Sequence, residues 1–189
     1  EFRRVLFRSF NIVSYASGAS GDKTITHNLN AVPKFIITKS RDSASYNWSI
    51  YHSSAVTNVK DYLTFTTGAL GNNGLNIWGA SLPTSSVFGI SSGNGVVANT
   101  NCIAYVWAEV PGFSKFGGYT GNFDTNGPFI HCGFRPKIVI IKNYTAGSAG
   151  SWRVYDTSRV MTNPIGSIMW LDLNTIETTS SSYDLDIVS

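Results

Sequence analysis

The chain has 189 residues, of which 42% are hydrophobic and 13% charged, with 14 Lys and Arg against 11 Asp and Glu. This apolar content excludes a disordered chain, and the near balance of charge excludes the strongly basic surface that nucleic-acid binding requires. No apolar run approaches the ~20 residues that a membrane-spanning helix needs.

The first nine residues resemble an artefact of sequencing. Residues 1–9, Glu-Phe-Arg-Arg-Val-Leu-Phe-Arg-Ser, resemble one reading frame of the adapter that is ligated to fragments in short-read libraries. Their apolar part, Val5-Leu6-Phe7, is too short for a signal peptide. We therefore expect residues 1–9 to be extraneous and the native N-terminus to be absent. That stretch holds three arginines and one glutamate, which leaves 11 basic and 10 acidic residues, a net charge of +1.

Residues 10–111 alternate short apolar segments with turn-forming ones. Ser, Thr, Asn and Gly supply most of the polar residues, and these residues cap and turn chains rather than extend helices. No stretch keeps apolar residues at helical spacing for three turns. We predict strands near residues 10–15, 23–27, 34–39, 47–52, 62–66, 75–78, 86–91 and 102–109. Such short strands with turn signals between them predict an all-β fold, and eight of them favour a jelly-roll-like antiparallel sandwich.

An internal repeat extends this pattern to the rest of the chain. Pro33–Lys39 matches Pro136–Lys142 at an offset of 103 residues, and Trp48–Tyr51 matches Trp152–Tyr155 at an offset of 104. Leu63-Thr64-Phe65 matches Leu171-Asp172-Leu173 more loosely. A repeat of this length suits a whole small domain rather than a solenoid unit.

The repeat predicts two β modules in tandem. The first spans residues 10–111 and the second residues 112–189. The second module ends before the counterpart of the strand near 102–109, so we expect it to be truncated at its C-terminal end. Because proline suits the first position of a strand, Pro33 and Pro136 are expected to open equivalent central strands, with Ile36 and Ile140 buried.

Four segments carry a resemblance to a known family: Thr24–Leu29, Val32–Lys39, Asn47–His52 and the joint Tyr105–Asn122. The joint reads Tyr-Val-Trp-Ala-Glu-Val-Pro-Gly-Phe-Ser-Lys-Phe-Gly-Gly-Tyr-Thr-Gly-Asn and is the most specific of them. Together they resemble an uncharacterised module that is repeated in tailed-bacteriophage proteins, especially marine ones. The resemblance covers almost all of residues 10–189. It departs at Cys132-Gly133, which stand where the first copy has Asn28-Leu29-Asn30.

The resemblance implies a virion-associated protein of tail-fibre or receptor-binding type, located in the tail. It brings no catalytic residues. We therefore expect a non-enzymatic structural or adhesion module, with a host-surface glycan or receptor and other virion subunits as partners, and without nucleic acid or membrane. Oligomers are expected in the full-length protein. The alternative is an appendage or fragment of a glycan-degrading enzyme of depolymerase type.

Two pairs of aromatic residues recur in the repeat and are candidate contacts. Residues three apart cannot share a face of a strand, so one of Trp48 and Tyr51 must point outward. We assign Trp48 and Trp152 to core packing. Tyr51 and Tyr155 are then the candidate glycan contacts, because an outward ring can stack on a sugar.

Two histidines, His27 and His131, precede the repeated Pro-Lys strands. Ligand binding or pH sensing is one interpretation. Recurrence within one chain favours a structural one, in which each histidine closes a turn by side chain–backbone hydrogen bonds.

The sequence offers no catalytic set, cofactor site or metal site. Gly147–Ser151 lacks the Gly-x-Ser-x-Gly pattern of a nucleophile, and Gly71–Gly74 is typical of a hairpin turn rather than a phosphate loop. Cys132 lies beside His131, but no second Cys/His cluster follows at metal-ligand spacing. Two cysteines are too few for a disulfide scaffold, and Cys102 is expected to be a small core residue.

Overall fold

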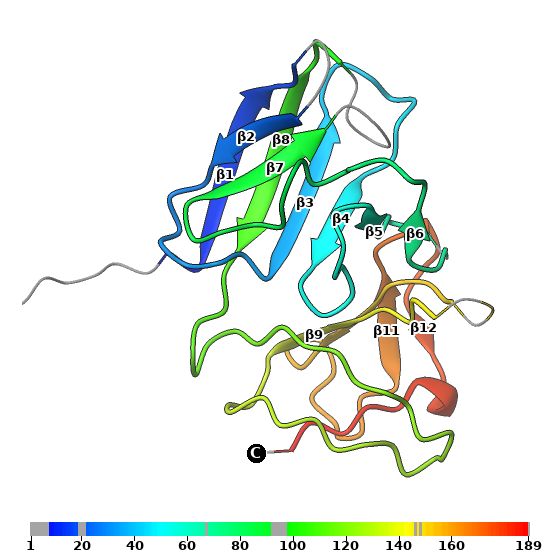
Figure 1. Ribbon diagram of the computed structural model, residues 1–189. Coiled ribbons are helices and arrows are strands. Elements are labelled where there is room, and N and C mark those ends of the chain that lie inside the picture. Colours follow the sequence, from blue (N-terminus) through cyan, green and yellow to red (C-terminus); the bar gives the residue numbers. More distant parts are fainter. Residues whose placement is uncertain are drawn as a thin grey trace, which may run out of the picture. The chain divides into compact units, whose positions relative to one another are not determined.

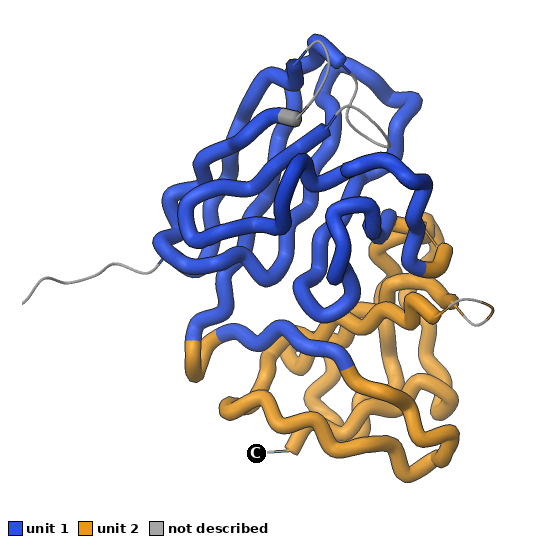
Figure 2. The backbone as a smooth tube through the Cα atoms, viewed as in Figure 1, with its two compact units in different colours: residues 1–64, 70–110, 114–118 blue, residues 65–69, 111–113, 119–189 orange. Residues whose placement is uncertain are grey.

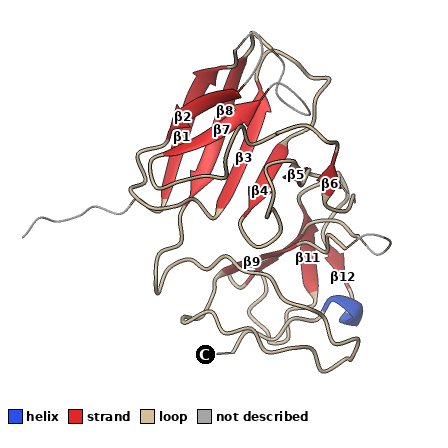
Figure 3. Cartoon of the chain, viewed as in Figure 1, coloured by secondary structure: helices blue, strands red, loops and turns tan. Residues whose placement is uncertain are grey.

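The computed structural model describes residues 8–18, 22–66, 68–91, 98–145, 147 and 149–188 (Figure 1). Within them the chain is all-β with antiparallel sheets, as predicted, and has a single turn of 3-10 helix, η1 (Ser181–Tyr183; Figure 3). No helix of this part of the chain could cross a bilayer. The chain forms two compact units: unit 1 holds residues 1–64, 70–110 and 114–118, and unit 2 holds residues 65–69, 111–113 and 119–189 (Figure 2).

Unit 1 is built on a four-stranded sheet with the order β1-β8-β3-β4. Its strands are β1 (Phe10–Ala16), β8 (Asn101–Trp107), β3 (Phe35–Ser40) and β4 (Ser49–His52). Two smaller antiparallel pairs complete it: β2 (Asp22–Thr26) with β7 (Val87–Ser91), and β5 (Asp61–Tyr62) with β6 (Gly71–Asn72). Figure 1 shows β2 and β7 lying over one face of β1, β8 and β3.

The core of unit 1 fills the space between these layers. Alternate residues of β3 and β8 are buried because successive side chains in a strand point to opposite faces. Trp78 and Phe88 are its largest fully buried side chains, and Cys102 is buried among them, as predicted. In a jelly roll, successive strands alternate between two sheets. The β1-β8-β3 and β2-β7 pairings follow that pattern, whereas β4 stays beside β3.

Six of the predicted strands, β1, β2, β3, β4, β7 and β8, lie within two residues of their expected ends. The prediction of a strand at 75–78 is wrong, because Ile77 and Trp78 are buried from a turn. The indole Nε1 of Trp78 donates to the carbonyl of Asp61 at 2.8 Å. Residues 77 and 78 are therefore apolar because they are buried, and not because they belong to a strand.

Unit 2 contains one four-stranded antiparallel sheet with the order β12-β11-β10-β9. Its strands are β9 (Ile138–Ile141), β10 (Arg153–Asp156), β11 (Ser167–Trp170) and β12 (Thr178–Thr179). One cluster of buried residues joins Tyr155 of β10 and Ile168 of β11 to Ile165 and Ile187 from outside the sheet.

The β3–β4 and β9–β10 hairpins have the same register. Ile36 pairs with Tyr51 in unit 1, and Val139 pairs with Tyr155 in unit 2. These pairs correspond at the offsets of 103 and 104 residues that the sequence repeat shows. The loose match at Leu171 is not reproduced, since Ile50 pairs with Leu63 but Val154 pairs with Met169.

The hairpins also share their closing contacts. The Lys39 ammonium donates to the carbonyl of Tyr46 at 2.7 Å, and Lys142 donates to the carbonyl of Gly150, which occupies the equivalent position. Each repeated lysine therefore closes the loop of its own hairpin. Likeness between the copies outside this hairpin stays a prediction.

The two hairpins differ in their surroundings. β3 is central, between β8 and β4, and Ile36 is fully buried as predicted. β9 lies at the edge of its sheet, and Ile140 is 48% exposed. The predictions that β9 is central and that Ile140 is buried are therefore wrong. Ile140 corresponds to Ile37 on the outward face, and β10 is the only strand of the described chain that pairs with β9.

The stretch proposed to be an adapter lies mostly outside the described residues, since residues 1–7 are not described. The carbonyl of Ser9 accepts the amide N–H of Ala108 at 3.0 Å, which prolongs the ladder between β1 and β8. This contact uses backbone atoms alone, so any residue at that position could make it.

Candidate functional site

An aromatic row crosses the four-stranded sheet of unit 1 on the face away from β2 and β7. The strand pairing places Phe10 opposite Trp107, Trp107 opposite Phe35, and Phe35 opposite His52. Neighbouring ring centroids in this row lie 4.9, 5.4 and 5.9 Å apart. One aromatic side chain therefore comes from each of the four strands, and together they cover one end of the sheet.

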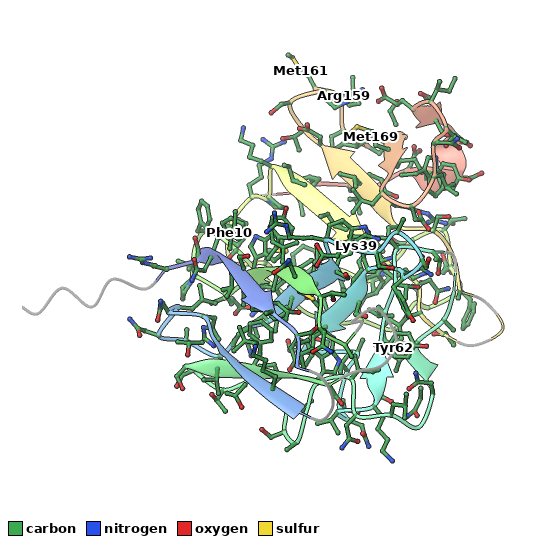
Figure 4. All side chains as sticks on the ribbon, turned by 90° about the horizontal axis from the view of Figure 1, so that it is seen from above. Phe10, Lys39, Tyr62, Arg159, Met161 and Met169 are labelled. Carbon is green, nitrogen blue, oxygen red and sulfur yellow. The ribbon has the colours of Figure 1, made fainter. Side chains whose placement is uncertain are left out.

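A second line of rings continues the row across the same face. Tyr105 lies next to Phe10 with the ring planes only 10° apart, and its centroid is 6.2 Å from that of Trp107. Trp48 follows at 6.3 Å from Tyr105, and the Lys39 ammonium lies 5.7 Å from the centre of the Trp48 ring. In Figure 4, Phe10 and Lys39 lie on the side of this sheet away from β2 and β7.

The joint after β8 adds a further ring. Phe116 lies 6.1 Å from Phe35 and 6.3 Å from His52. The Glu109 carboxylate accepts the amide N–H of Phe116 at 3.0 Å and binds the Lys115 ammonium at 3.1 Å. The hydrogen bond from Phe116, with help from Lys115, lowers the pKa of Glu109 below its usual value. This turn holds the joint against the sheet.

We call this surface the aromatic face; it consists of Phe10, Phe35, Trp48, His52, Tyr105, Trp107 and Phe116. Phe10 is 39% exposed and the other rings are half-buried, while the neighbouring Ile12 is 53% exposed. A contiguous apolar surface of this kind on a folded domain marks a binding site more often than scattered apolar residues do. Burial lowers the pKa of His52, so its ring is neutral at pH 7 and belongs with the apolar side chains.

Polar groups border the aromatic face toward the end of the sheet opposite the row that contains Phe10 and Trp107. The Arg41 guanidinium donates to the Ser14 hydroxyl at 3.5 Å, and Lys39 lies on the same face. The face therefore combines flat apolar rings with hydrogen-bond donors. Among the described residues, no three His, Cys, Asp or Glu side chains gather as metal ligands would.

A domain of unknown function, DUF7483, matches residues 7–189 of the chain. The chain belongs to the DUF7483 family. No curated protein and no solved structure matches the chain significantly. The match takes in the described parts of both units, so both hairpins lie within one DUF7483 domain.

The DUF7483 domain buries the two tyrosines that the sequence suggested as glycan contacts. Tyr51 is 4% exposed and packs edge-on against Trp78 at 5.4 Å, and Tyr155 is 3% exposed. Burial raises the pKa of both phenols. The assignment of Tyr51 and Tyr155 is corrected accordingly: the register places each ring on the inner face of its sheet, where it cannot stack on a sugar.

The tryptophan that precedes each of these tyrosines by three residues is placed differently in the two units. Trp152 is buried, as predicted, with its ring 5.5 Å from Phe65. Trp48 was assigned to the core but lies half-buried on the aromatic face. It faces outward because it precedes Tyr51 by three positions, and Tyr51 is buried.

Sequence reasoning missed most of the aromatic face. A partial signal was present, since Tyr105 and Trp107 alternate with the buried Val106 and so had to share one face. Nothing in the sequence indicated that Phe10 and Phe35 lie on either side of Trp107, because that proximity depends on strand pairing.

His27 has the structural role that its position suggested. Its ring is fully buried, and Nδ1 accepts the amide N–H of Leu29 at 3.2 Å. Nε2 therefore carries the proton and donates to the carbonyl of Thr84 at 3.0 Å. His131 is exposed, with its ring 6.5 Å from Phe129, so the repeat does not preserve this arrangement.

The burial of His27 predicts acid sensitivity in the DUF7483 domain. Burial lowers the pKa of His27 below 6.5. At pH values between this lowered pKa and 6.5, the unfolded chain therefore binds a proton that the folded chain does not. The stabilisation is complete above pH 6.5 and is lost as the pH falls through the pKa of the folded state. We expect His27→Gln to flatten the decrease in melting temperature between about pH 7.5 and about pH 5. His131→Gln is the matched control and should keep the wild-type decrease; an unchanged decrease in His27→Gln would contradict the prediction.

Proposed function

We propose that this DUF7483 domain is a non-enzymatic adhesion module of a tailed-phage virion protein, and that its aromatic face binds host-surface glycan. The observation that carries the proposal is the row of four aromatic side chains, one from each strand of the main sheet. A rigid sheet holds these rings in place without the entropy cost of ordering a loop.

The chemistry of the aromatic face favours a sugar as its ligand. A pyranose presents an apolar C–H face, which packs on flat rings such as Phe10 and Tyr105, and a rim of hydroxyl groups. Arg41 and Ser14 border the rings and supply hydrogen-bonding groups for that rim. The nearly neutral charge of the chain suits an uncharged or weakly charged glycan better than a strongly acidic polymer.

The part of the proposal that places the domain in a phage virion is supported by the sequence. The joint Tyr105–Asn122 resembles the segment that links repeated modules in tail-fibre and receptor-binding proteins. In that setting the module would lie in the tail, within an oligomer that contains other virion subunits. Its ligand would be met outside the host cell.

A glycan array and host envelope polysaccharide test the proposal directly. We expect saturable binding by the wild-type chain and a loss of about tenfold or more in affinity on Trp107→Ala, because truncating a tryptophan at the centre of a binding surface typically costs about 2 kcal/mol or more. Phe10→Ala is the second variant, since Phe10 lies at the rim of the face and its loss should not perturb the core. Phe123→Ala is the matched control, because Phe123 is an exposed aromatic residue of unit 2.

Three results would contradict the proposal. The first is no binding of any glycan by the wild-type chain, which would leave only a spacer role. The second is unchanged binding in both aromatic-face variants, provided that their melting temperatures show a folded protein. The third is release of new reducing ends from the polysaccharide, which would indicate the enzyme alternative.

A further inference from the structure

The edge of β9 in unit 2 is the second feature that points to a partner. No strand of the described chain pairs with this edge, since β9 ends its sheet. We infer that the open edge of β9 binds an extended strand of the β8 type supplied by another polypeptide. This inference is independent of glycan binding.

Unit 1 shows how the same hairpin accommodates that strand. The β3–β4 hairpin has the register of β9–β10, and β3 pairs with β8 at six positions, from Phe35 opposite Trp107 to Ser40 opposite Cys102. In unit 1, therefore, β8 is the strand that pairs with the outer edge of this hairpin.

The backbone of β9 presents bonding groups to the open edge. The amide N–H of Thr157 donates to the carbonyl of Lys137 at 3.0 Å, which makes Ile138 and Asp156 a non-hydrogen-bonded pair. The N–H and C=O groups of Ile138 and Ile140 therefore point away from β10. In unit 1, the corresponding bond from Ser53 to Lys34 leaves Phe35 and Ile37 facing β8.

The side chains at this edge are also left uncovered. Ile138 is 59% exposed and Ile140 is 48% exposed, although both belong to a strand of four consecutive apolar residues. Exposed apolar edge strands are ready templates for pairing with another chain, and a strand laid beside β9 would cover part of both side chains.

Charge favours a strand that ends in an acidic residue. In unit 1, Glu109 follows β8, and Lys34 is near enough to contribute to the lowered pKa of Glu109, after the larger effects of Phe116 and Lys115. Lys137 occupies the position of Lys34 in unit 2. A β8-type strand would therefore bring its terminal carboxylate toward Lys137.

The same charges disfavour a second copy of β9 as the occupant. Lysines flank β9 at both ends, at positions 137 and 142, so a second copy would bring only positive charge to an edge that is already positively charged. It would also offer no carboxylate to Lys137. The occupant that fits best has small inward residues, as β8 has in Cys102, Ala104 and Val106, followed by an acidic residue.

A labelled peptide of residues 100–110, Thr-Asn-Cys-Ile-Ala-Tyr-Val-Trp-Ala-Glu-Val, tests the inference with the full chain. We expect saturable binding in fluorescence anisotropy, and at least tenfold weaker binding to Ile140→Pro. Proline removes an N–H that points to the open edge and that the β9–β10 ladder does not use. Ile140→Thr is the matched control, because it keeps both the N–H and a β-branched side chain. A peptide with lysine in place of Glu109 should bind several-fold more weakly.

Hydrogen exchange on the wild-type chain supplies a readout that needs no variant. We expect the amides of Ile138 and Ile140 to exchange faster than those of Val139 and Ile141, and to become protected when the peptide is bound. Absence of binding, equal binding by a folded Ile140→Pro, or protection confined to unit 1 would each overturn the inference. Self-association of the chain that Ile140→Pro abolishes would also overturn it, in favour of pairing between copies.

Discussion

Replacing Ile36 with alanine is expected to lower the free energy of unfolding of unit 1 by about 2–5 kcal/mol, whereas the same change at Ile37 should cost only about 1 kcal/mol. The two residues are neighbours in β3, but Ile36 is fully buried in the core and Ile37 is half-buried on the outer face. Truncating Ile36 leaves a cavity between the two layers of the sandwich. Denaturant unfolding followed by tryptophan fluorescence measures both costs.

The pair contains its own control, because both variants make the same substitution in the same strand. An Ile37 variant as unstable as the Ile36 variant would show that the outer face is covered as completely as the core. That result would also count against the aromatic face as a binding surface. Phe35-Ile36-Ile37 is apolar throughout, and such a run by itself favours a strand that is covered on both faces.

Replacing Gly89 with alanine is expected to destabilise unit 1 by about 3 kcal/mol, near the upper end of the usual cost of overpacking. Gly89 lies in the middle of β7, and an added Cβ would come within 2.4 Å of the carbonyl oxygen of Trp78 and 3.1 Å of the Cα of Gly79. Both neighbours are backbone atoms, so no rotation of a side chain can relieve the clash. Thermal unfolding measures the loss.

Gly117→Ala is the matched control for this substitution. No heavy atom lies within 4 Å of the Cβ that it would add, so its effect should stay within about ±0.5 kcal/mol. Equal melting temperatures for the two variants would contradict the close packing of β7 against the turn that contains Trp78. A large loss at Gly89 alone would confirm that β7 packs closely against the backbone of this turn.

Several features of the fold could be predicted from the sequence because they depend on neighbouring residues. Alternation and turn-forming residues located β1, β3 and β8, and with them the all-β class. The proline before each repeated strand and the matching tryptophan and tyrosine identified the hairpin that occurs twice. These signals are local, since a strand and the turn that ends it are specified within about ten residues.

Only the tertiary structure decided which face of each strand is buried. A period of two residues defines two faces but does not say which is inward. For this reason the sequence alone favoured Trp48 in the core and Tyr51 on the surface, whereas the structure has the reverse. The aromatic row depends on pairing between Phe10 and Trp107, which lie far apart in the sequence. The exposure of Ile140 likewise depends on the position of β9 at the edge of the described sheet rather than on the sequence of β9, which is as apolar as that of a buried strand. Burial and strand pairing are properties of the assembled sheets, so no local pattern could determine them.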